Sequence, residues 1–508
     1  MLERELKLYV PVAQQAAVAQ AMALMQNQPA VSLAAHYFDT AQRDLARQQA
    51  ALRLRLEGEQ WVQTLKLRAQ DELSVLEFNH LRAEPSLDLS LYENTAAQTV
   101  IQNLTQPLVM RYQTKVVRTI ALVWHQGSEI EIAWDVGQIK AKNHSLPISE
   151  VEFELKSGQM AAVFDLGSQW LHALPLLLEL RSKSERGDAL YECTPTGSAA
   201  LHGAEAALAI AAQPYRIGQI PAPEHIDLIS LYHQASQRFL AQIIRNAAFL
   251  AGIDEITAPS DLHASYLTLM RVGMRRLRSC RQLFKPWLHA SEQLQAEQLV
   301  QQYRKFGQWR DKDMLWLELQ PKIIAAGLPA AKKLEPPKRL KRNPRLIAAS
   351  QNYQLLLLEN LKNIVLEQGL QTKATEADQM QRLARRLQRT WQRIQTLSRQ
   401  FDSLPPTERH YLRNQIKRLR YNLEALSFDE TLPVYVYLAK AQDHLGDLCD
   451  AYVAKDWYKE QAATKGQKQF ALQWLDQKIE KYDLKSKKTL DCLQAQRLEI
   501  MALELIAQ

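Results

Sequence analysis

Hydrophobic and polar residues alternate in two different ways along this chain. Up to about residue 198, short segments alternate with a period of two between turn residues, which predicts β-strands. From about residue 222 onward, apolar residues recur with a period of 3.6, which predicts helices. Gly, Pro and Ser are frequent between the two regions. The pattern therefore predicts a strand-rich domain at 1–198, a linker at 199–221 and an all-helical domain at 222–508.

The helical region contains an internal repeat. MRVGMRRLRS at Met270–Ser279 is similar to LRNQIKRLRY at Leu412–Tyr421. Downstream of each copy, FGQWRDKDM and HLGDLCDAY form a second matched pair, each with a Gly–x–x–x–Asp step. A repeated pair of helices predicts two similar helical bundles about a pseudo-twofold axis.

Several predicted strands carry charged residues on one face only. Alternate residues of a strand share a face, so Glu3, Glu5 and Lys7 point the same way. A solvated outer face is the simpler interpretation of any single strand. Purely acidic and purely basic strands in one domain instead predict an antiparallel barrel with an acidic and a basic wall inside. The segment from Pro11 to Asn27 would cover the apolar outside. Further sets that share a face are Arg53 with Arg55, and Glu150 with Glu152 and Glu154, while Lys66 and Glu131 fit less sharply.

A tunnel with both walls is suited to a metal–phosphate site. Arg and Lys bind phosphate oxygens, and Mg²⁺ or Mn²⁺ bridge carboxylates to phosphates. Without such ions the carboxylates would repel a polyphosphate chain. The sequence contains no GxxxxGK[ST] loop and no GxGxxG turn, which argues against a P-loop or Rossmann phosphate site.

Charge is distributed unevenly along the chain. Residues 1–200 hold 18 Lys and Arg against 23 Asp and Glu, whereas the whole chain holds 63 against 55. The basic second part indicates an anionic partner, which can be nucleic acid, polyphosphate or a membrane surface. No motif that reads a DNA groove is evident, so polyphosphate fits better than sequence-specific nucleic acid.

Other features restrict the class of protein. No stretch approaches the roughly 20 apolar residues that cross a bilayer, and the N-terminus has no apolar signal region. The four cysteines form no CxxC pair, which argues against a zinc site or a disulfide framework. We expect a cytoplasmic protein with no membrane partner, and the sequence leaves the oligomeric state open.

The first 190 residues resemble the CYTH superfamily, the triphosphate tunnel metalloenzymes. ERELK at Glu3–Lys7 resembles the ExExK signature of that family. Seven further segments follow in the expected order: HYFDT at 36–40, ALRLR at 51–55, QTLK at 63–66, LEFN at 76–79, EIAWD ending at Asp135, SEVEFEL at 149–155 and SKSERG at 182–187, with Arg118 at the place of a phosphate-binding Arg.

The helical region resembles the CHAD domain, which is often fused to CYTH. HYLRNQIKRLRY at 410–421 is close to its HxLRxxxKRLRY helix, and RDKD at 310–313 and QDHLGDLCD at 442–450 resemble two further elements. The first repeat departs from the pattern, because Thr268 stands where a His is expected. As a whole, the fusion resembles bacterial inorganic triphosphatases of the CYTH–CHAD type.

This resemblance implies Mg²⁺- or Mn²⁺-dependent hydrolysis of inorganic triphosphate to diphosphate and phosphate. Glu3, Glu5 and Lys7 are the expected catalytic residues, and no single carboxylate can be assigned as the general base. The expected phosphate-binding residues are Lys7, Arg53, Arg55, Lys66, Arg118, Lys183 and, at the tunnel mouth, Arg186. The expected metal ligands are Glu3, Glu5, Glu77, Asp135, Glu150, Glu152 and Glu154.

The repeated basic helices are the expected polyanion-binding surface. Their basic residues recur at i, i+4 and i+7, which places them on one helix face. The alternative is a solvated face whose charges pair with carboxylates such as Asp443 and Asp450. The candidates are Arg271, Arg275, Arg278, His410, Arg413, Lys417 and Arg420, and long-chain polyphosphate is a possible ligand.

Two alternative functions stay open. One is another CYTH activity, namely thiamine- or nucleoside-triphosphate hydrolysis or cyclic-AMP synthesis, which needs a pocket for an organic group at one tunnel mouth. The other is a non-catalytic polyphosphate-binding adaptor. The acidic strands disfavour the adaptor, because a pure polyanion binder gains nothing from Glu3, Glu5, Glu150 and Glu152.

Overall fold

The computed structural model describes residues 1–69, 71–192, 213–223, 225–254, 262–333, 343–367, 369–370 and 375–498. The chain forms two compact units, and each unit is assembled from three separate stretches of the sequence. The barrel unit consists of Met1–Arg216, Leu240–Met270 and Arg342–Gln368; the helical unit consists of Ile217–Phe239, Arg271–Lys341 and Gly369–Gln508. The predicted limits at 198 and 222 are positions along the sequence where strand patterns give way to helix patterns. The barrel unit differs from that division because it also includes two later stretches, Leu240–Met270 and Arg342–Gln368.

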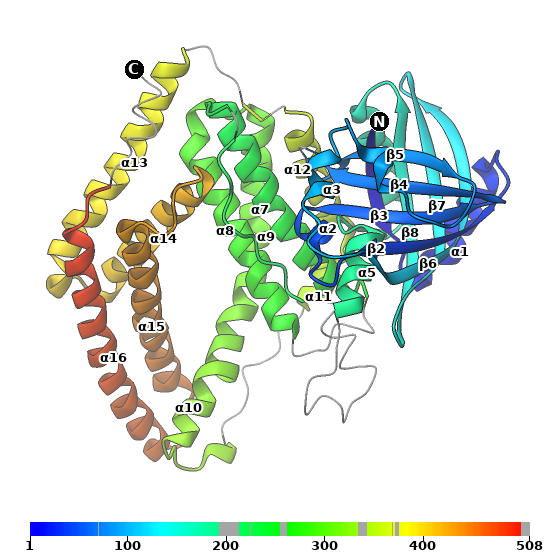
Figure 1. Ribbon diagram of the computed structural model, residues 1–508. Helices are drawn as coiled ribbons and strands as arrows, with labels where there is room; N and C mark the ends of the chain where they lie inside the picture. Colours follow the sequence, from blue (N-terminus) through cyan, green and yellow to red (C-terminus); the bar gives the residue numbers. More distant parts are fainter. Residues whose placement is uncertain are drawn as a thin grey trace. The chain divides into compact units, whose positions relative to one another are not determined.

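The barrel unit is built on antiparallel strands that close into a barrel (Figure 1). Neighbouring strands follow the order β5-β4-β3-β2-β6-β7-β8-β1, and pairing of β1 with β5 closes the ring of eight. The strands are β1 (Leu2–Tyr9), β2 (Val31–Asp39), β3 (Ala50–Glu57), β4 (Gln60–Arg68), β5 (Ser74–Arg82), β6 (Val109–His125), β7 (Ser128–Ala141), β8 (His144–Ser157) and the short β9 (Leu177–Leu178), which pairs with β1. This architecture confirms the predicted antiparallel barrel.

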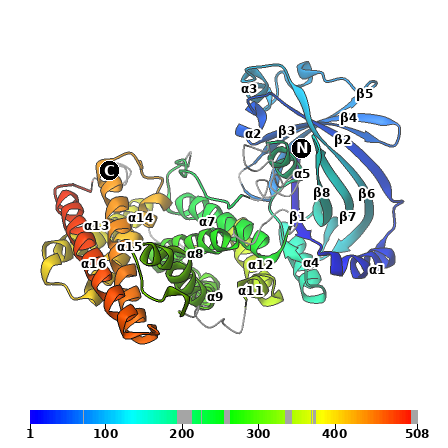
Figure 2. The ribbon, with the colours of Figure 1, turned by 90° about the horizontal axis from the view of Figure 1, so that it is seen from below.

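Helices cover the apolar outside of the barrel (Figure 2). The helix α1 (Gln15–Met25), entered through the 3₁₀ turn η1 (Val12–Gln14), contacts β6 with Val18 and Met22 buried, as the segment from Pro11 to Asn27 predicted. The helix α4 (Met160–Ala173) packs against β1 and β8. Gly167 allows this close approach, because a Cβ there would lie 2.4 Å from Leu6 Cδ2.

Shorter elements complete the barrel unit. Asp39 ends β2 and accepts hydrogen bonds from the backbone N–H groups of Thr40, Leu45 and Ala46, so it caps the turn into α2. This cap is the kind of partner that the free N–H groups of a helix start require. The elements are α2 (Asp44–Arg47), η2 (Leu89–Tyr92), α3 (Gln98–Gln102), α5 (Lys183–Glu192), α11 (Pro344–Ala348) and α12 (Gln351–Val365).

The remaining elements are helical, and two long helices supply residues to both units. Residues of α7 (Leu228–Ala251) and α8 (His263–Phe284) belong to both compact units. The others are η6 (Lys285–Trp287), α9 (Ala290–Asp313), the π-helix η7 (Met314–Leu319), α10 (Gln320–Ala325), η8 (Ala331–Lys333), α13 (Glu376–Arg399), η9 (Phe401–Ser403), α14 (Pro406–Ala425), α15 (Pro433–Gln461) and α16 (Lys465–Gln494). Within the described parts of the chain, no helix has the length and apolarity to span a membrane.

The internal repeat relates α8 to α14 and α9 to α15, and the same contact recurs in both copies. The Arg413 Nη2 atom lies 3.0 Å from the place that a Cβ on Gly446 would take. Likewise, the Arg271 Nη2 atom lies 3.4 Å from the corresponding place at Gly307. The glycine of each Gly–x–x–x–Asp step therefore makes room for the first arginine of the preceding basic helix.

Candidate active site

The strand register brings the predicted charges to one face of the barrel. Lys7 in β1 lies opposite Glu152 in β8, and Glu150 lies opposite Asp135 in β7. Asp135 in turn lies opposite Arg118 in β6. Because directly opposed residues of antiparallel strands point to the same side, these five side chains share the interior face.

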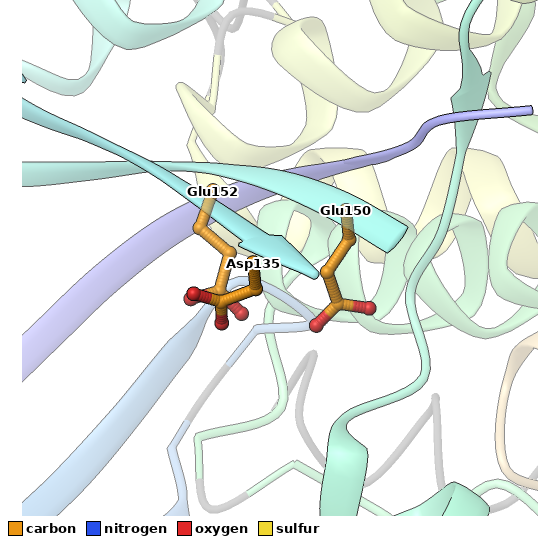
Figure 3. A group of neighbouring side chains, drawn as sticks. All are labelled: Asp135, Glu150 and Glu152. Atoms are coloured by element: carbon orange, nitrogen blue, oxygen red, sulfur yellow. The ribbon is translucent and has the colours of Figure 1, made fainter. Parts of the chain in front are cut away.

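Three buried carboxylates form the centre of this site. Asp135, Glu150 and Glu152 each offer one oxygen, and these oxygens all lie within 4.8 Å of one another (Figure 3). The three side chains project to the same side of β7 and β8. We call Asp135, Glu150 and Glu152 the carboxylate triplet. Oxygen donors at this spacing suit Mg²⁺ or Mn²⁺.

Lys183 and Arg118 each pair with more than one member of the carboxylate triplet. Lys183 Nζ lies 2.7 Å from Asp135, 2.5 Å from Glu150 and 2.8 Å from Glu152. Arg118 donates to both oxygens of Asp135 at 2.7 Å and to Glu152 Oε2 at 2.6 Å. Although burial alone would raise the pKa of the Glu152 carboxyl, Lys183 and Arg118 hold that pKa well below its ordinary value. Glu152 is therefore ionised at neutral pH.

Glu5 has the opposite behaviour in the same interior. Burial, followed by the nearby Glu152 carboxylate, raises the pKa of Glu5 to about 7, against the effect of Lys7. Lys7 Nζ is 3.6 Å from Glu5 and 3.7 Å from Glu152. A carboxyl with a pKa near neutrality can change its protonation state during a reaction.

The basic wall lies on β3 and β4. Lys66 Nζ is 2.5 Å from Glu3 and 3.4 Å from Glu77, and Arg53 is 3.7 Å from Glu77. Burial and the neighbouring Arg53 lower the pKa of the Arg55 guanidinium, although Glu57 pairs with it. Arg53, Arg55 and Lys66 share one face of the paired strands β3 and β4, and this concentration of positive charge favours an anionic ligand.

The surroundings of two predicted site residues, Glu154 and Arg186, differ from those that the sequence led us to expect. Glu154 pairs with Lys156 at 2.8 Å and does not belong to the carboxylate triplet. Arg186, which was expected at the tunnel mouth, has a fully buried side chain that donates to the Pro147 carbonyl at 2.6 Å and to Asp254 at 2.8 Å. Arg186 also lies 3.4 Å from Glu150 Oε2, so it is a buried neighbour of the carboxylate triplet rather than an exposed residue at a tunnel mouth.

A cavity of about 690 Å³ reaches the charged interior. Glu5, Lys7 and Lys66 form part of its lining. Residues that the sequence did not single out also line it, including Arg181 before α5 and Arg245 in α7. Arg181 stands directly before the SKSERG segment, which was a usable signal, whereas Arg245 lies in a helix with no motif that points to the barrel.

The predicted polyanion-binding residues are only partly exposed. Arg278 and His410 are exposed, whereas Arg271 and Arg413 are buried beside their glycines. Arg413 lies 3.7 Å from Asp450. The remaining candidates are partly buried: Arg275, whose partners include Tyr303 and Tyr421; Lys417; and Arg420, which lies 3.4 Å from Glu424.

A second cavity, of about 260 Å³, lies in the helical unit. Burial and Arg389 lower the pKa of Arg386, and burial, Arg278 and Arg393 lower the pKa of Arg418. We call the residues that line it the arginine pocket: Gln282, Leu283, Arg386, Arg389, Thr390, Arg393, Gln415, Arg418 and Asn422. No sequence pattern pointed to this pocket, because Arg386, Arg389 and Arg393 lie outside the repeat.

Comparison with known proteins identifies both regions. Residues 1–187 match the CYTH domain model, and residues 238–459 match the CHAD domain model. An inorganic triphosphatase from Haemophilus influenzae is 33% identical over 158 residues, which are 30% of this chain and 44% of that protein. The chain thus spans less than half the length of this curated relative.

Solved structures resemble each region separately. The CHAD domain of the plant Ricinus communis is 22% identical and covers 56% of this chain and 98% of its own, with a TM-score of 0.43. A Hippeastrum protein, described as an adenylyl cyclase with a dominant triphosphatase activity, is 19% identical and covers 37% of this chain and 94% of its own, with a TM-score of 0.29.

Proposed function

We propose that this protein, whose chain joins a CYTH domain to a CHAD domain, hydrolyses inorganic triphosphate to diphosphate and phosphate inside the barrel. CYTH domains form the triphosphate tunnel family and bind triphosphate substrates. The observation that carries the proposal is the carboxylate triplet and the basic residues Arg53, Arg55 and Lys66 in one barrel interior. In this proposal the carboxylates bind a divalent cation, and the arginines and lysines bind the phosphate chain.

The donor set of the carboxylate triplet fits a divalent cation. Asp135, Glu150 and Glu152 supply three close carboxylate oxygens, and Glu3 and Glu5 stand on the adjacent β1. A bound Mg²⁺ or Mn²⁺ would supply charge neutralisation at phosphate oxygens. Lys183 and Arg118, which now pair with the triplet, are then free to turn toward the phosphate chain.

The basic side chains hold the phosphate chain in this scheme. Lys7, Arg53 and Lys66 each have a nearby carboxylate partner in the structure, at distances of 2.5 to 3.7 Å. A triphosphate would replace these partners with phosphate oxygens and place positive charge where negative charge develops during the reaction. Arg55 and Lys183 extend the same surface.

Glu5 is the general base in this proposal. With a pKa of about 7 it is partly ionised at neutral pH and can accept the proton of the attacking water. Glu5 lies on β1 near Lys7, and Glu152 of the carboxylate triplet and Lys66 of the basic wall both affect its pKa. The more strongly paired Glu152 stays ionised and is suited to cation binding instead.

The CHAD domain is the second functional part, and CHAD domains are associated with polyphosphate. Exposed Arg278 and His410 and the arginine pocket supply positive charge on the helical unit. Partial desolvation of the exposed His410 ring, together with Arg413 and Lys417, lowers the pKa of His410, so this side chain is neutral at pH 7 and can form hydrogen bonds without adding charge.

One observation favours a second class of substrate. The cavity of about 690 Å³ is large enough for an organic group, and Phe38, Tyr112 and Phe249 contribute aromatic side chains to it. A thiamine or nucleoside triphosphate would place its organic part there and its phosphates at Lys7 and Lys66.

Phosphate release from a panel of substrates tests the proposal. Triphosphate, long-chain polyphosphate, ATP and thiamine triphosphate are each incubated with Mg²⁺, Mn²⁺ or EDTA. We expect the highest kcat/KM for triphosphate with a divalent cation and no release in EDTA. Faster turnover of ATP or thiamine triphosphate would favour the second class, and no release from any substrate would favour the adaptor. We expect Glu150→Gln to be inactive, and Glu84→Gln, at an exposed position, is its matched control.

A further inference from the structure

A short segment that follows the first long helix of the CHAD region belongs to the barrel unit. Asp254, just after α7, is buried and has a left-handed φ of 52°. Its two carboxylate oxygens have separate partners: Oδ1 accepts from Arg186 Nη2 at 2.8 Å, and Oδ2 accepts from Arg181 Nη2 at 3.1 Å. A buried carboxylate between two buried guanidiniums is held in place by charge-assisted hydrogen bonds.

Both arginines also contact residues of the candidate active site. Arg186 Nη1 lies 3.4 Å from Glu150 Oε2, and Glu150 is a member of the carboxylate triplet. The backbone carbonyl of Arg181 accepts a hydrogen bond from Lys7 Nζ at 3.3 Å. Asp254 is therefore one residue removed from Glu150 and from Lys7.

The charges around Arg186 indicate what the loss of Asp254 would do. Arg186 is fully buried and has two carboxylate partners, Asp254 and Glu150. A buried cation that loses one partner is strongly destabilised unless it moves closer to the other. Without the charge of Asp254, Arg186 would pair more closely with Glu150 and draw that carboxylate away from Asp135 and Glu152.

We propose that Asp254 is a positioning residue of the barrel site, which holds Arg186 so that Glu150 stays directed at Asp135 and Glu152. The inference rests on the proposed function only for the role of the carboxylate triplet as the divalent-cation site. It makes a segment of the CHAD part of the chain a component of the triphosphatase site, at a position where no motif marks it.

Mn²⁺ binding to the full-length protein tests this role without relying on activity. Metal-free wild type and Asp254→Asn are titrated with MnCl₂ in a calorimeter, and melting curves are recorded for both. We expect the Mn²⁺ dissociation constant to rise by about 10- to 100-fold in the variant, as for residues that orient a metal ligand. Asp254→Glu, which retains the charge, should recover most of the affinity. Affinity of Asp254→Asn equal to that of the wild type would overturn the inference.

A matched control separates positioning from general loss of stability. Glu292 is also a fully buried carboxylate, and it pairs with Arg281 and with the Tyr232 hydroxyl in the helical unit. Glu292→Gln should lower the melting temperature while leaving the Mn²⁺ affinity unchanged. An equal loss of Mn²⁺ affinity in both variants would show that stability alone is responsible.

The double variant tests whether Asp254 acts through Arg186. In the Arg186→Gln background, Asp254→Asn should change Mn²⁺ affinity no further, because the group that Asp254 positions is absent. This comparison also serves if Asp254→Asn alone fails to fold, since the double variant buries no excess positive charge at residue 186. A further tenfold loss in this background would overturn the inference.

A wild type that binds Mn²⁺ but releases no phosphate would refute the proposed function alone, whereas a wild type that binds no Mn²⁺ would overturn the inference directly.

Discussion

The barrel interior and the arginine pocket of the helical unit both collect positive charge, but the two sites balance it in different ways. In the barrel, Lys183 has three carboxylates within 2.8 Å, and Arg118 pairs with Asp135 through two hydrogen bonds. In the arginine pocket, Arg386 donates instead to the backbone carbonyls of Gln282 and Leu283.

This difference indicates two kinds of ligand. A cation that pairs with carboxylates can exchange its partner when a divalent cation and a phosphate chain arrive together. Cations that lie near one another and donate to neutral groups lack such balance, so an anion alone lowers their mutual repulsion. We therefore expect metal-dependent chemistry in the barrel and metal-independent polyanion binding in the helical unit.

Glu5→Gln should produce the largest effect, because it removes the proposed base while keeping the side-chain volume. We expect kcat for triphosphate to fall by about 10²- to 10⁴-fold. In the wild type, the rate should fall as the pH drops below about 7, where Glu5 becomes protonated, and this limb should be absent in the variant. A pH–rate profile of both proteins is the measurement, and an unchanged acidic limb would assign the base elsewhere.

The same substitution makes a prediction for stability. The folded state raises the pKa of Glu5, so it favours the protonated form, and the contribution of this group to stability is lost as the pH rises through about 7. Glu5→Gln should therefore gain stability relative to the wild type between pH 5 and pH 8. Denaturant melts at the two pH values check the sign.

Arg53→Ala tests the basic wall and should have the next largest effect. Loss of a hydrogen bond to a charged group costs about 1.5–3 kcal/mol, so kcat/KM should fall by roughly 10- to 150-fold at fixed metal concentration. Lys115→Ala is a suitable control, because Lys115 is an exposed cation on β6, a strand that does not pair with the strand of Arg53. An effect below about threefold at Arg53 would remove it from the phosphate-binding surface.

Neutralising the helical unit should separate the two regions. Arg389→Gln with Arg393→Gln in the full-length chain should weaken long-chain polyphosphate binding and reduce its salt dependence, because fewer counterions are released. Hydrolysis of triphosphate should stay unchanged. Arg382→Gln with Arg385→Gln, on the same helix but outside the arginine pocket, is the control. Titrations at two salt concentrations decide, and equal losses in both pairs would indicate only a general effect of charge.

Glu154→Gln should have the smallest effect. Glu154 pairs with Lys156 and lies outside the carboxylate triplet, although the sequence placed it among the metal ligands. We expect Mn²⁺ affinity to change by less than about 1 kcal/mol, because Glu154 pairs with Lys156 and is not directed at the carboxylate triplet. A calorimetric titration beside Glu150→Gln gives the comparison, and equal losses at both positions would extend the metal site to Glu154.

Local pattern determined much of the barrel. Alternation places Glu3, Glu5 and Lys7 on one face, and a strand has only two faces, so closing the barrel was enough to bring them inside. The order of the family motifs added Arg118 and Lys183, which lie on other elements. The antiparallel register then placed Arg118 opposite Asp135, a pairing that follows from hydrogen bonding between strands far apart in the sequence.

By itself, the sequence determined the two kinds of secondary structure, the charged strand faces and the repeat of basic helices, because periodicity and spacing are local properties. Three features arise only in the folded chain: Asp254 contacts Arg181 and Arg186, Arg186 is buried, and Arg418 of the repeat lies in one pocket with arginines of α13. The physical reason is that these contacts join segments without a shared period or motif. Burial, which shifts the pKa of Glu5 toward neutrality, likewise exists only once the chain has closed around it.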